Sequence, residues 1–314
     1  MKLKIQRAHK LIELHSEARD KIQQGGEIMK KIRIVAGALP FMAVHAIAIA
    51  APFFMAFRWW YIPLVVVVYY FRMWGVTIGY HRFFAHKAFK TSRTFQYALA
   101  FIAESSAQKG IAWWAGWHRE HHRPDVTDTS RDIHTPVGNG FWWSHVGWIF
   151  SGKYNETRWD LVSDIGSFPE LRWLSKYHLV PPVTLAVSTF LTGRLTGNGW
   201  GDAFSLLVWG FFVTTAMLWH GSFCINSLAH IRMWGSRKLW NTPFNTFDSM
   251  VLNVITGGEG WHDSHHAHQA AAKQGERNQM EPTYSILCLL AWVGVVWDLK
   301  PRPTAARYEL LGGA

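Results

Sequence analysis

The chain has 314 residues, of which 49% are hydrophobic, 15% aromatic and 17% charged, and it contains 19 Trp. This composition is richer in aromatic residues than that of ordinary soluble domains and indicates a membrane protein. No nucleic-acid motif accompanies the formal net charge of +11, so we attribute this charge to membrane orientation and to attraction by anionic headgroups, with no nucleic-acid partner. The two cysteines, Cys224 and Cys288, lie in apolar segments and indicate neither a disulfide framework nor a CxxC metal site.

A charged head, residues 1–33, precedes the first apolar run, so we expect no secretory signal peptide. Four apolar segments are then predicted to cross the bilayer as helices: Ile34–Phe57, Trp59–Tyr80, His178–Gly193 and Ala203–Ile225. The first runs for 24 residues without a charged side chain, which at about 1.5 Å per residue exceeds the roughly 30 Å hydrocarbon core. Arg72, in the second, must reach the interface or face other protein. The apolar runs 95–103 and 284–297 are too short to cross and are expected to be interfacial or packed helices.

The basic residues predict the orientation of these helices. Every Lys and Arg except Arg58 and Arg194 lies in the head, in the segment Arg72–Lys176 or after His230. Because basic residues mark the cytoplasmic face, both termini and the middle segment are predicted to be cytoplasmic. The predicted fold is therefore an all-α, multi-pass integral membrane protein with four transmembrane helices and a cytoplasmic helical cap. Its expected divisions are 1–33 (head), 34–80 (helices one and two), 81–177 (cytoplasmic), 178–225 (helices three and four) and 226–314 (cytoplasmic).

Four histidine-rich motifs lie at the cytoplasmic ends of the predicted spans. HRFFAH contains His81 and His86, HREHH contains His118, His121 and His122, NSLAH contains Asn226 and His230, and HDSHH contains His262, His265 and His266. HRFFAH follows the second span, HREHH precedes the third, and NSLAH and HDSHH follow the fourth. Since all four motifs fall on one side of the membrane, they are predicted to converge on one site.

The spacing of these histidines indicates metal ligation. Positions i, i+3 and i+4 of a helix lie within an arc of roughly 100°, so we expect the three rings of HREHH to point into one cavity, and likewise those of HDSHH. His81 and His86 diverge by about 140° on an ideal helix, which predicts either a helix end between them or ligation of different metals. Neutral imidazole is a common ligand of iron, copper and zinc. Nine imidazoles are more than one metal needs, so two metals are predicted.

Each signal also has an ordinary structural interpretation. A single HxxHH motif on a polar helix is more often a surface feature than a metal site, and only the coincidence of four motifs on one face favours ligation. The remaining histidines are not expected to be ligands; they are His9, His15, His45, His134, His145, His178, His220 and His268. The Trp-rich stretches are expected to form interfacial belts and packing. Glu259 and Asp263 beside the last motif either accept ring N–H bonds and orient the ligands or cap local structure.

The segments GYHRFFAH, WHREHHRPDVTD, NSLAH, GEGWHDSHH and WVGVVWDLKP occur in this order. Over roughly residues 60–300 the chain resembles the membrane-bound fatty-acid desaturases of the stearoyl-CoA and acyl-lipid Δ9 type. The resemblance implies that two Fe ions are bound by the nine histidines of the four motifs, with Asn226 approaching one iron through water. Asn226 is alternatively a simple helix-end residue.

The resemblance further implies oxygen-dependent insertion of a cis double bond, at Δ9, into a saturated acyl chain. In place of the Trp-Ala-Arg-Asp of acyl-CoA members, this chain has WAGW at 114–117; the segment RDIHTP comes two residues late, and GERNQMEP replaces a Trp-richer stretch. These departures favour a lipid- or carrier-bound substrate over acyl-CoA.

No HPGG, iron–sulfur cysteine pattern or GxGxxG motif is present in the sequence, so a separate electron donor of the ferredoxin or cytochrome b5 type is expected. The alternative functions are a related diiron fatty-acyl hydroxylase and a non-catalytic metal-binding transporter or sensor.

Overall fold

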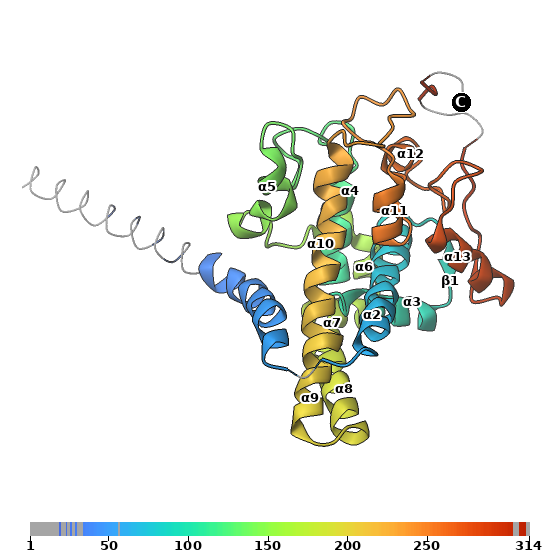
Figure 1. Cartoon of the computed structure of the whole chain (residues 1–314). Helices are drawn as coiled ribbons and strands as arrows, with labels where there is room; N and C mark the ends of the chain where they lie inside the picture. Colours follow the sequence, from blue (N-terminus) through green and yellow to red (C-terminus); the bar gives the residue numbers. More distant parts are fainter. Residues whose placement is uncertain are drawn as a thin grey trace, which may run out of the picture.

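The computed structural model describes residues 34–55, 57–303 and 308–311 together with the single positions Arg19, Gln23, Gly26 and Met29. Most of the predicted charged head therefore lies outside the described residues. The described part is helical apart from a two-stranded antiparallel sheet, in which β1 (Lys90–Thr91) pairs with β2 (Val296–Trp297). Figure 1 shows long helices at one end of the molecule and a cap of shorter helices and loops at the other.

Within the described chain, three helices are long and apolar enough to cross a membrane: Ile34–Phe53, Tyr61–Ala85 and Trp200–His230. Three of the four segments predicted to cross therefore form helices that could do so, with ends that differ from the prediction. The first is shorter than predicted and closes with a 3-10 turn, η1 (Ala51–Phe53). The second begins as α2 (Tyr61–Trp74) and continues five residues past the predicted end at Tyr80 as a π-helix, η2 (Gly75–Ala85). The third contains α9 (Trp200–Leu207), the π-helical η5 (Val208–Val213), α10 (Thr214–Ser227) and the 3-10 turn η6 (Leu228–His230).

The remaining predicted span corresponds to α8 (Val180–Thr196), whose first turn accommodates Pro181 and Pro182. Its 17 residues rise about 26 Å, slightly less than the hydrocarbon thickness. In Figure 1, α8 packs beside α9 as a hairpin at the end opposite the cap. A fourth crossing therefore stays a prediction.

Arg72, on the second helix, is fully buried. Its side chain faces other parts of the protein and does not reach toward a membrane interface, which is one of the two predicted arrangements. Its guanidinium donates to the carbonyl of Ser105 and to the hydroxyls of Thr214 and Thr215. These bonds join the second helix to α10 and to the end of α3, and they satisfy a charge that apolar surroundings would otherwise penalise.

The cap contains the shorter elements. They are α3 (Arg93–Glu104), α4 (Ile111–His121), α5 (Gly140–His145), η3 (Gly147–Ser151), η4 (Trp159–Leu161), α6 (Ser163–Gly166), α7 (Pro169–Lys176), α11 (Met250–Thr256), α12 (His262–Ala267) and α13 (Pro282–Trp292). Side-chain oxygens begin two of them: Ser92 accepts from the N–H of Phe95 before α3, and Ser249 from that of Leu252 before α11. As expected for the two short apolar runs, α3 and α13 are helices of 12 and 11 residues.

The core lies where the second helix meets α3, α4 and α10. Its buried residues include Tyr80, Leu99, Ile111 and Leu218. The close approach of α3 to the π-helix depends on glycine, because a Cβ at Gly75 would meet the carbonyl oxygen of Ile102 at 2.9 Å. This packing holds the end of the second helix, with its histidines, against α4.

Candidate metal centre

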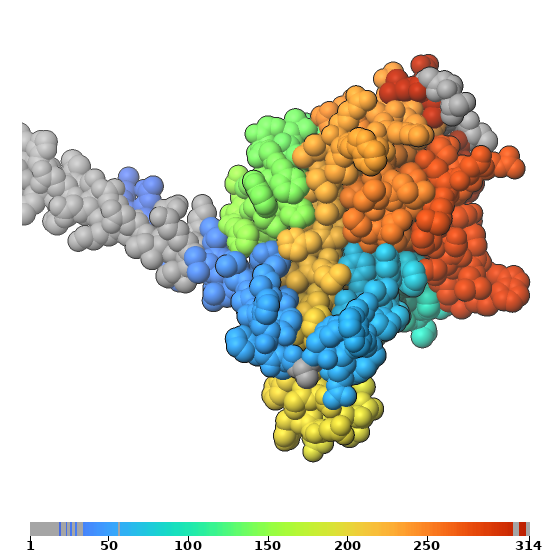
Figure 2. Space-filling view, viewed as in Figure 1, coloured from blue at the N-terminus to red at the C-terminus, as the bar shows by residue number. Residues whose placement is uncertain are grey.

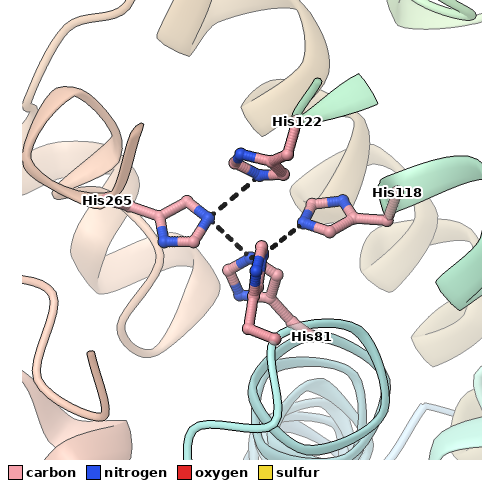
Figure 3. A group of neighbouring side chains, drawn as sticks. His81, His118, His122 and His265 are labelled. Atoms are coloured by element: carbon pink, nitrogen blue, oxygen red, sulfur yellow. Dashed lines mark hydrogen bonds between the residues drawn. The ribbon is translucent and has the colours of Figure 1, made fainter. Parts of the chain in front are cut away.

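Nine histidines converge in the cap and form two neighbouring groups. Within each group the ligand nitrogens all lie within 4.8 Å of one another. The first group is His81, His86, His118, His122 and His265, and the second is His121, His230, His262 and His266. All nine histidines predicted as ligands therefore meet, and Figure 3 shows rings of the first group turned toward a common centre from three different parts of the chain. The groups adjoin, since the rings of His122 and His266 stack with centroids 4.3 Å apart.

The π-helix explains how His81 and His86 reach the same group. The N–H of His86 donates to the carbonyl of His81 at 3.0 Å, an i to i+5 bond. This wider turn brings residues five apart toward the same side, whereas an ideal α-helix would separate them. The helix ends at Ala85, directly before His86, so a helix end in this segment is observed as one of the two predicted alternatives. The other alternative, ligation of different metals, was based on α-helical geometry, but the segment is a π-helix and both rings belong to the same group.

The histidines of HREHH and HDSHH divide between the groups. On α4 and its C-cap, His118 and His122 join the first group and His121 the second; on α12, His262 and His266 join the second and His265 the first. The expectation that each motif points into a single cavity was therefore wrong. In each motif the two histidines four residues apart belong to the same group, because side chains at i and i+4 lie almost above one another on a helix. The remaining histidine, His121 or His265, points toward the other group.

The chemistry of the donor set fits cations. In the first group, Nε2 of His86 lies 2.8 Å from Nε2 of His118 and 3.1 Å from Nε2 of His81, and Nε2 of His265 lies 3.0 Å from Nε2 of His122. In the second, Nε2 of His262 lies 2.9 Å from Nε2 of His230. A proton can bridge only two nitrogens at a time, so converging lone pairs are satisfied together only by a metal ion.

Carboxylates on the outer nitrogens direct these lone pairs inward. Nδ1 of His81 lies 2.6 Å from Glu259, and Nδ1 of His121 lies 2.9 Å from Asp132. Since a carboxylate accepts, each Nδ1 carries the hydrogen and each Nε2 presents its lone pair to the group. Nδ1 of His230 lies 3.3 Å from Asp128 in the same sense. Sequence reasoning identified Glu259 but missed Asp128 and Asp132, although both belong to the acidic stretch that directly follows HREHH.

Arg82 fixes Glu259 in this position. Its buried guanidinium donates to Glu259 at 2.7 Å and to Glu281 at 2.8 Å, and also to the carbonyls of Gly258 and Ala272. Burial opposes ionisation of Glu259, but the Arg82 guanidinium and the hydrogen bonds from His81 and Gln274 outweigh it and lower the pKa of this carboxyl. An ionised Glu259 is the form that can accept the N–H of His81.

Asp263 accepts from no histidine and does not cap α12, so neither of its two predicted roles is observed. Its carboxylate accepts from the backbone N–H groups of Leu239 and Trp240 and from the hydroxyls of Thr242 and Thr246. Asp263 thereby holds the loop that follows NSLAH against α12, which positions the last motif as a whole.

Burial keeps most of the rings neutral. It is the largest cause that lowers the pKa of six of them, namely His86, His118, His122, His262, His265 and His266. The pKa of His121 is instead raised, because Asp132 and its hydrogen bond outweigh burial. Neutral imidazole is the form that binds a metal.

Other polar residues lie close to the groups. His134 was not expected to be a ligand, and this stays a prediction; its ring centroid is 4.7 Å from that of His121, and it forms a third potential ligand group with His121 and Asp132. His268 packs against Trp240 and is in none of these groups. Asn226 lines the adjoining cavity, and its approach to a metal through water stays a prediction.

A largely apolar cavity of about 520 Å³ adjoins the groups. Its wall includes Ile34 and Phe41 of the first helix together with His118, Glu259 and His262. This arrangement can hold a long apolar molecule with one part beside the histidines.

Comparison with known proteins agrees with this geometry. The fatty acid desaturase family model matches residues 57–273. The chain is 33% identical over 272 residues to the Delta-9 acyl-lipid desaturase 1 of Arabidopsis thaliana, covering 86% of this chain and 84% of that one. It is 32% identical over 240 residues to the sn-2 palmitoyl-lipid 9-desaturase of Nostoc sp. (strain 36), covering 75% and 79%.

An acyl-CoA 5-desaturase of Anemone leveillei is 31% identical over 261 residues, with 82% of this chain and 76% of that one covered. The relatives thus act on both acyl-lipids and acyl-CoA, and their names place the double bond at different positions. All of them are desaturases, and desaturases are oxidoreductases. The chain therefore belongs to the fatty acid desaturase family, is an oxidoreductase, and bears in its cap the histidine groups that can hold the metal of that family.

Proposed function

We propose that this enzyme inserts a cis double bond at Δ9 of a saturated acyl chain, with O2 as oxidant and two iron ions held by the two histidine groups. The observation that carries the proposal is the position of two groups of buried imidazoles at the wall of an apolar cavity. An unactivated methylene offers neither an acidic proton nor a leaving group, so the reaction needs a strong oxidant. Bound irons supply that oxygen-activating chemistry.

The residues of the chain have separate tasks in this proposal. His81, His86, His118, His122 and His265 hold one iron, while His121, His230, His262 and His266 hold the other, with Asn226 reaching it through water. Glu259, Asp128 and Asp132 orient rings through Nδ1. The cavity excludes water and holds the acyl chain at a fixed depth, which selects the carbon that reacts.

The structure favours an acyl-lipid over acyl-CoA as the substrate. Among the residues that the structure describes, Lys109 is the single Lys or Arg that lines the cavity, and its ammonium already donates to Asn155. Gly116 and Trp117 stand where acyl-CoA members are expected to have Arg and Asp. A CoA group carries several phosphate charges that would need cations at such a mouth. The resemblance of the motifs and the relatives named as 9-desaturases support the Δ9 position.

The membrane topology belongs to the same proposal. Four crossings, with both termini and the histidine groups on the cytoplasmic side, place the site within reach of a soluble electron donor. Arg123 and Arg131, in the loop after α4, are exposed at the cap end, whereas Arg58 and Arg194 lie near the opposite ends of the helices. This distribution of charge supports a cytoplasmic cap.

Expression in a host that lacks unsaturated-fatty-acid synthesis tests the proposal. Gas chromatography of the host lipids should reveal a new Δ9 alkene with the wild-type chain and none with His265→Ala, which removes a ligand of the first group. Alkene formation in both strains, or hydroxylated product alone, would contradict the assignment; the latter result would identify the related hydroxylase activity.

A further inference from the structure

A tight turn shortly after NSLAH holds a tryptophan out into solvent. Trp234 is 99% exposed, more than any other large hydrophobic residue that the structure describes. The carbonyl of Met233 accepts from the N–H of Ser236 at 3.1 Å, and Gly235 has φ +75°, as the third residue of a type II turn requires. The hydroxyl oxygen of Ser236 also accepts from the N–H of Met233 at 2.9 Å. The turn is therefore fixed at both ends, and its conformation directs Trp234 outward.

The position of this turn excludes a role as a membrane anchor. The segment between α10 and α11 forms the end of the cap opposite the α8–α9 hairpin, and Figure 2 shows its orange atoms on the surface there. The helix Trp200–His230 has 31 residues, which rise about 45 Å and exceed the hydrocarbon core by about 15 Å. In the proposed topology Trp234 therefore lies beyond the membrane boundary, in the cytoplasm, where an aromatic side chain of an interfacial belt would not be.

Two arginines flank the tryptophan. Arg232 and Arg237 are exposed, and in the described part of the chain neither guanidinium has an ion-pair partner or a side-chain hydrogen bond. A Trp held between two unpaired arginines has the composition of a binding interface, in which both residue types are enriched. We call Arg232, Trp234 and Arg237 the turn surface.

Positive charge predominates around the turn surface. The loop after α4 adjoins the segment that follows NSLAH, since the N–H of Asn245 donates to Asp128 at 2.6 Å, and this loop adds the exposed Arg123 and Arg131. Among the described residues 122–132, 231–249 and 308–311, the exposed carboxylates are Asp125, which already pairs with both of these arginines, and Glu309. This excess of cations favours a partner with acidic side chains.

Two short connections join the turn surface to the metal groups. Trp234 follows His230 of the second group by four residues, so their Cα atoms are at most about 14 Å apart. Arg237 and Asp248 exchange backbone hydrogen bonds of 2.8 and 2.7 Å. The carboxylate of Asp248 accepts from the N–H and the hydroxyl of Ser264 on α12, which contributes ligands to both groups. A molecule bound at the turn surface is thus close enough to pass electrons to the groups through a few bonds.

We propose that the turn surface is where an electron-carrier protein docks, with acidic side chains around its redox group. The inference rests on the proposed function: removal of two hydrogen atoms from the acyl chain while O2 becomes two waters takes up two electrons from a donor and two protons from solvent. Each turnover thus oxidises two reduced carriers by one electron each. The carrier must leave between the two transfers, which suits a small contact with one aromatic anchor and charges that speed association.

The test compares purified, iron-loaded wild-type enzyme with Trp234→Ala and with the double variant Arg232→Glu, Arg237→Glu. Turnover is measured against the concentration of reduced plant-type ferredoxin and, separately, of reduced cytochrome b5. For whichever carrier supports the wild type, we expect kcat/KM to fall about tenfold or more in both variants. Added salt should slow the wild type and affect the double variant much less. Arg172→Glu, which changes an exposed arginine on α7, is the matched control.

A second measurement bypasses the carrier. Each enzyme is reduced by dithionite without O2, freed of excess reductant, and then mixed with O2 and substrate for a single turnover. We expect the same alkene yield per iron and the same iron content in the wild type, both variants and the control, because this reaction needs no docking. A loss seen only with the carrier therefore reports binding at the turn surface, whereas a damaged metal centre would lower both measurements.

Unchanged carrier kinetics in either variant would overturn the proposal, as would a loss of single-turnover yield in both. If one variant alone loses iron, the other decides the question. Turnover of the wild type with neither carrier, despite alkene formation after dithionite reduction, would also overturn it. So would dissociation of a wild-type oligomer by Trp234→Ala in size-exclusion chromatography, which would assign the turn surface to a second copy of the chain. A wild type that forms no alkene even after dithionite reduction would instead contradict the proposed function, so the two failures are distinguishable.

Discussion

Glu259 illustrates how single carboxylates prepare the metal groups. Its oxygens bind Nδ1 of His81 on one side and the guanidinium of Arg82 on the other. The first contact fixes the tautomer of a ligand, and the second keeps the carboxylate ionised in a buried site. Neither a longer nor a neutral side chain would combine these two tasks.

Glu259→Gln should weaken iron binding about 10- to 100-fold, because an amide cannot replace the charged acceptor of the His81 N–H. Iron content after dialysis against a weak chelator measures the effect, with activity falling in parallel. Glu170→Gln is the matched control, since Glu170 pairs with Arg93 at the surface and contacts no histidine. Equal iron retention by the two variants would show that Glu259 has no positioning role.

For single residues, the sequence allowed us to predict which histidines converge, but not how they divide between the two groups. The four motifs specify which rings lie on the same side of the membrane. Helical spacing explains why His118 and His122 share a group, but whether His121 meets the ligands of α12 depends on how α4 and α12 face each other, which is a tertiary contact. Asp128 and Asp132 were missed for a similar reason, because a carboxylate after a histidine motif is as compatible with a surface loop as with an outer hydrogen bond.

Among the elements, the π-helix Gly75–Ala85 has the clearest functional effect. It brings His81 and His86 into one group and places Gly75 and Gly79 against α3, where added side chains would meet the backbone of Ile102 and Leu99. The histidines of the second helix are therefore positioned by both helix type and helix packing.

Gly75→Val should destabilise the protein by about 1–3 kcal/mol, as expected for overpacking of a close contact, and should lower iron content because η2 is displaced from α3. Thermal unfolding in detergent and metal analysis would measure both. Gly37→Val is the control, since no atom lies within 4 Å of a Cβ at Gly37 on the first helix. Equal stability of the two variants would contradict the packing argument.

The long apolar helices could be predicted because apolar runs of this length with few or no charges are typical of helices that cross a membrane. Their ends could not. The second helix continues beyond Tyr80 because hydrogen bonds of the i to i+5 type extend it to His86, and a hydropathy pattern contains no signal for a change of helix type. The β1–β2 pair was also missed, since two residues per strand give no periodicity.

For the molecule as a whole, the convergence of neutral rings makes stability depend on pH. Burial lowers the pKa of six histidines of the metal groups in the folded state. The unfolded chain therefore binds more protons below pH about 6.5, so the free energy of unfolding falls as the pH decreases through that value and levels off above it.

The iron-free protein should consequently lose stability between pH 7 and pH 5 with a slope steeper than that of one proton, about 1.4 kcal/mol per pH unit. Denaturant unfolding at a series of pH values provides the measurement. His118→Leu combined with His122→Leu removes two of these rings and should flatten the slope. A pH-independent midpoint in the unmodified chain would show that the rings are protonated equally in the folded and unfolded states.

The orientation of the molecule could be argued from the sequence because its basic residues are so unevenly distributed, with Arg58 and Arg194 alone outside three segments. The cavity could not, because its wall combines the first helix with α10 and η3, which lie far apart in the sequence. His45, His145 and His220 looked like isolated histidines in the sequence and become hydrogen-bonded partners only where the first helix, α5 and α10 meet.

The division of HREHH and HDSHH between the two groups limits how the centre can be modified. Because α4 and α12 each contribute rings to both groups, any shift of either helix alters both coordination spheres together. Under the diiron proposal, neither iron can be exchanged for another metal or given a different redox potential by reshaping a single motif. Variation in substrate use among such enzymes would then have to arise in the part of the cavity wall that lies on helices without ligands, such as Phe41 of the first helix and Val183 of α8.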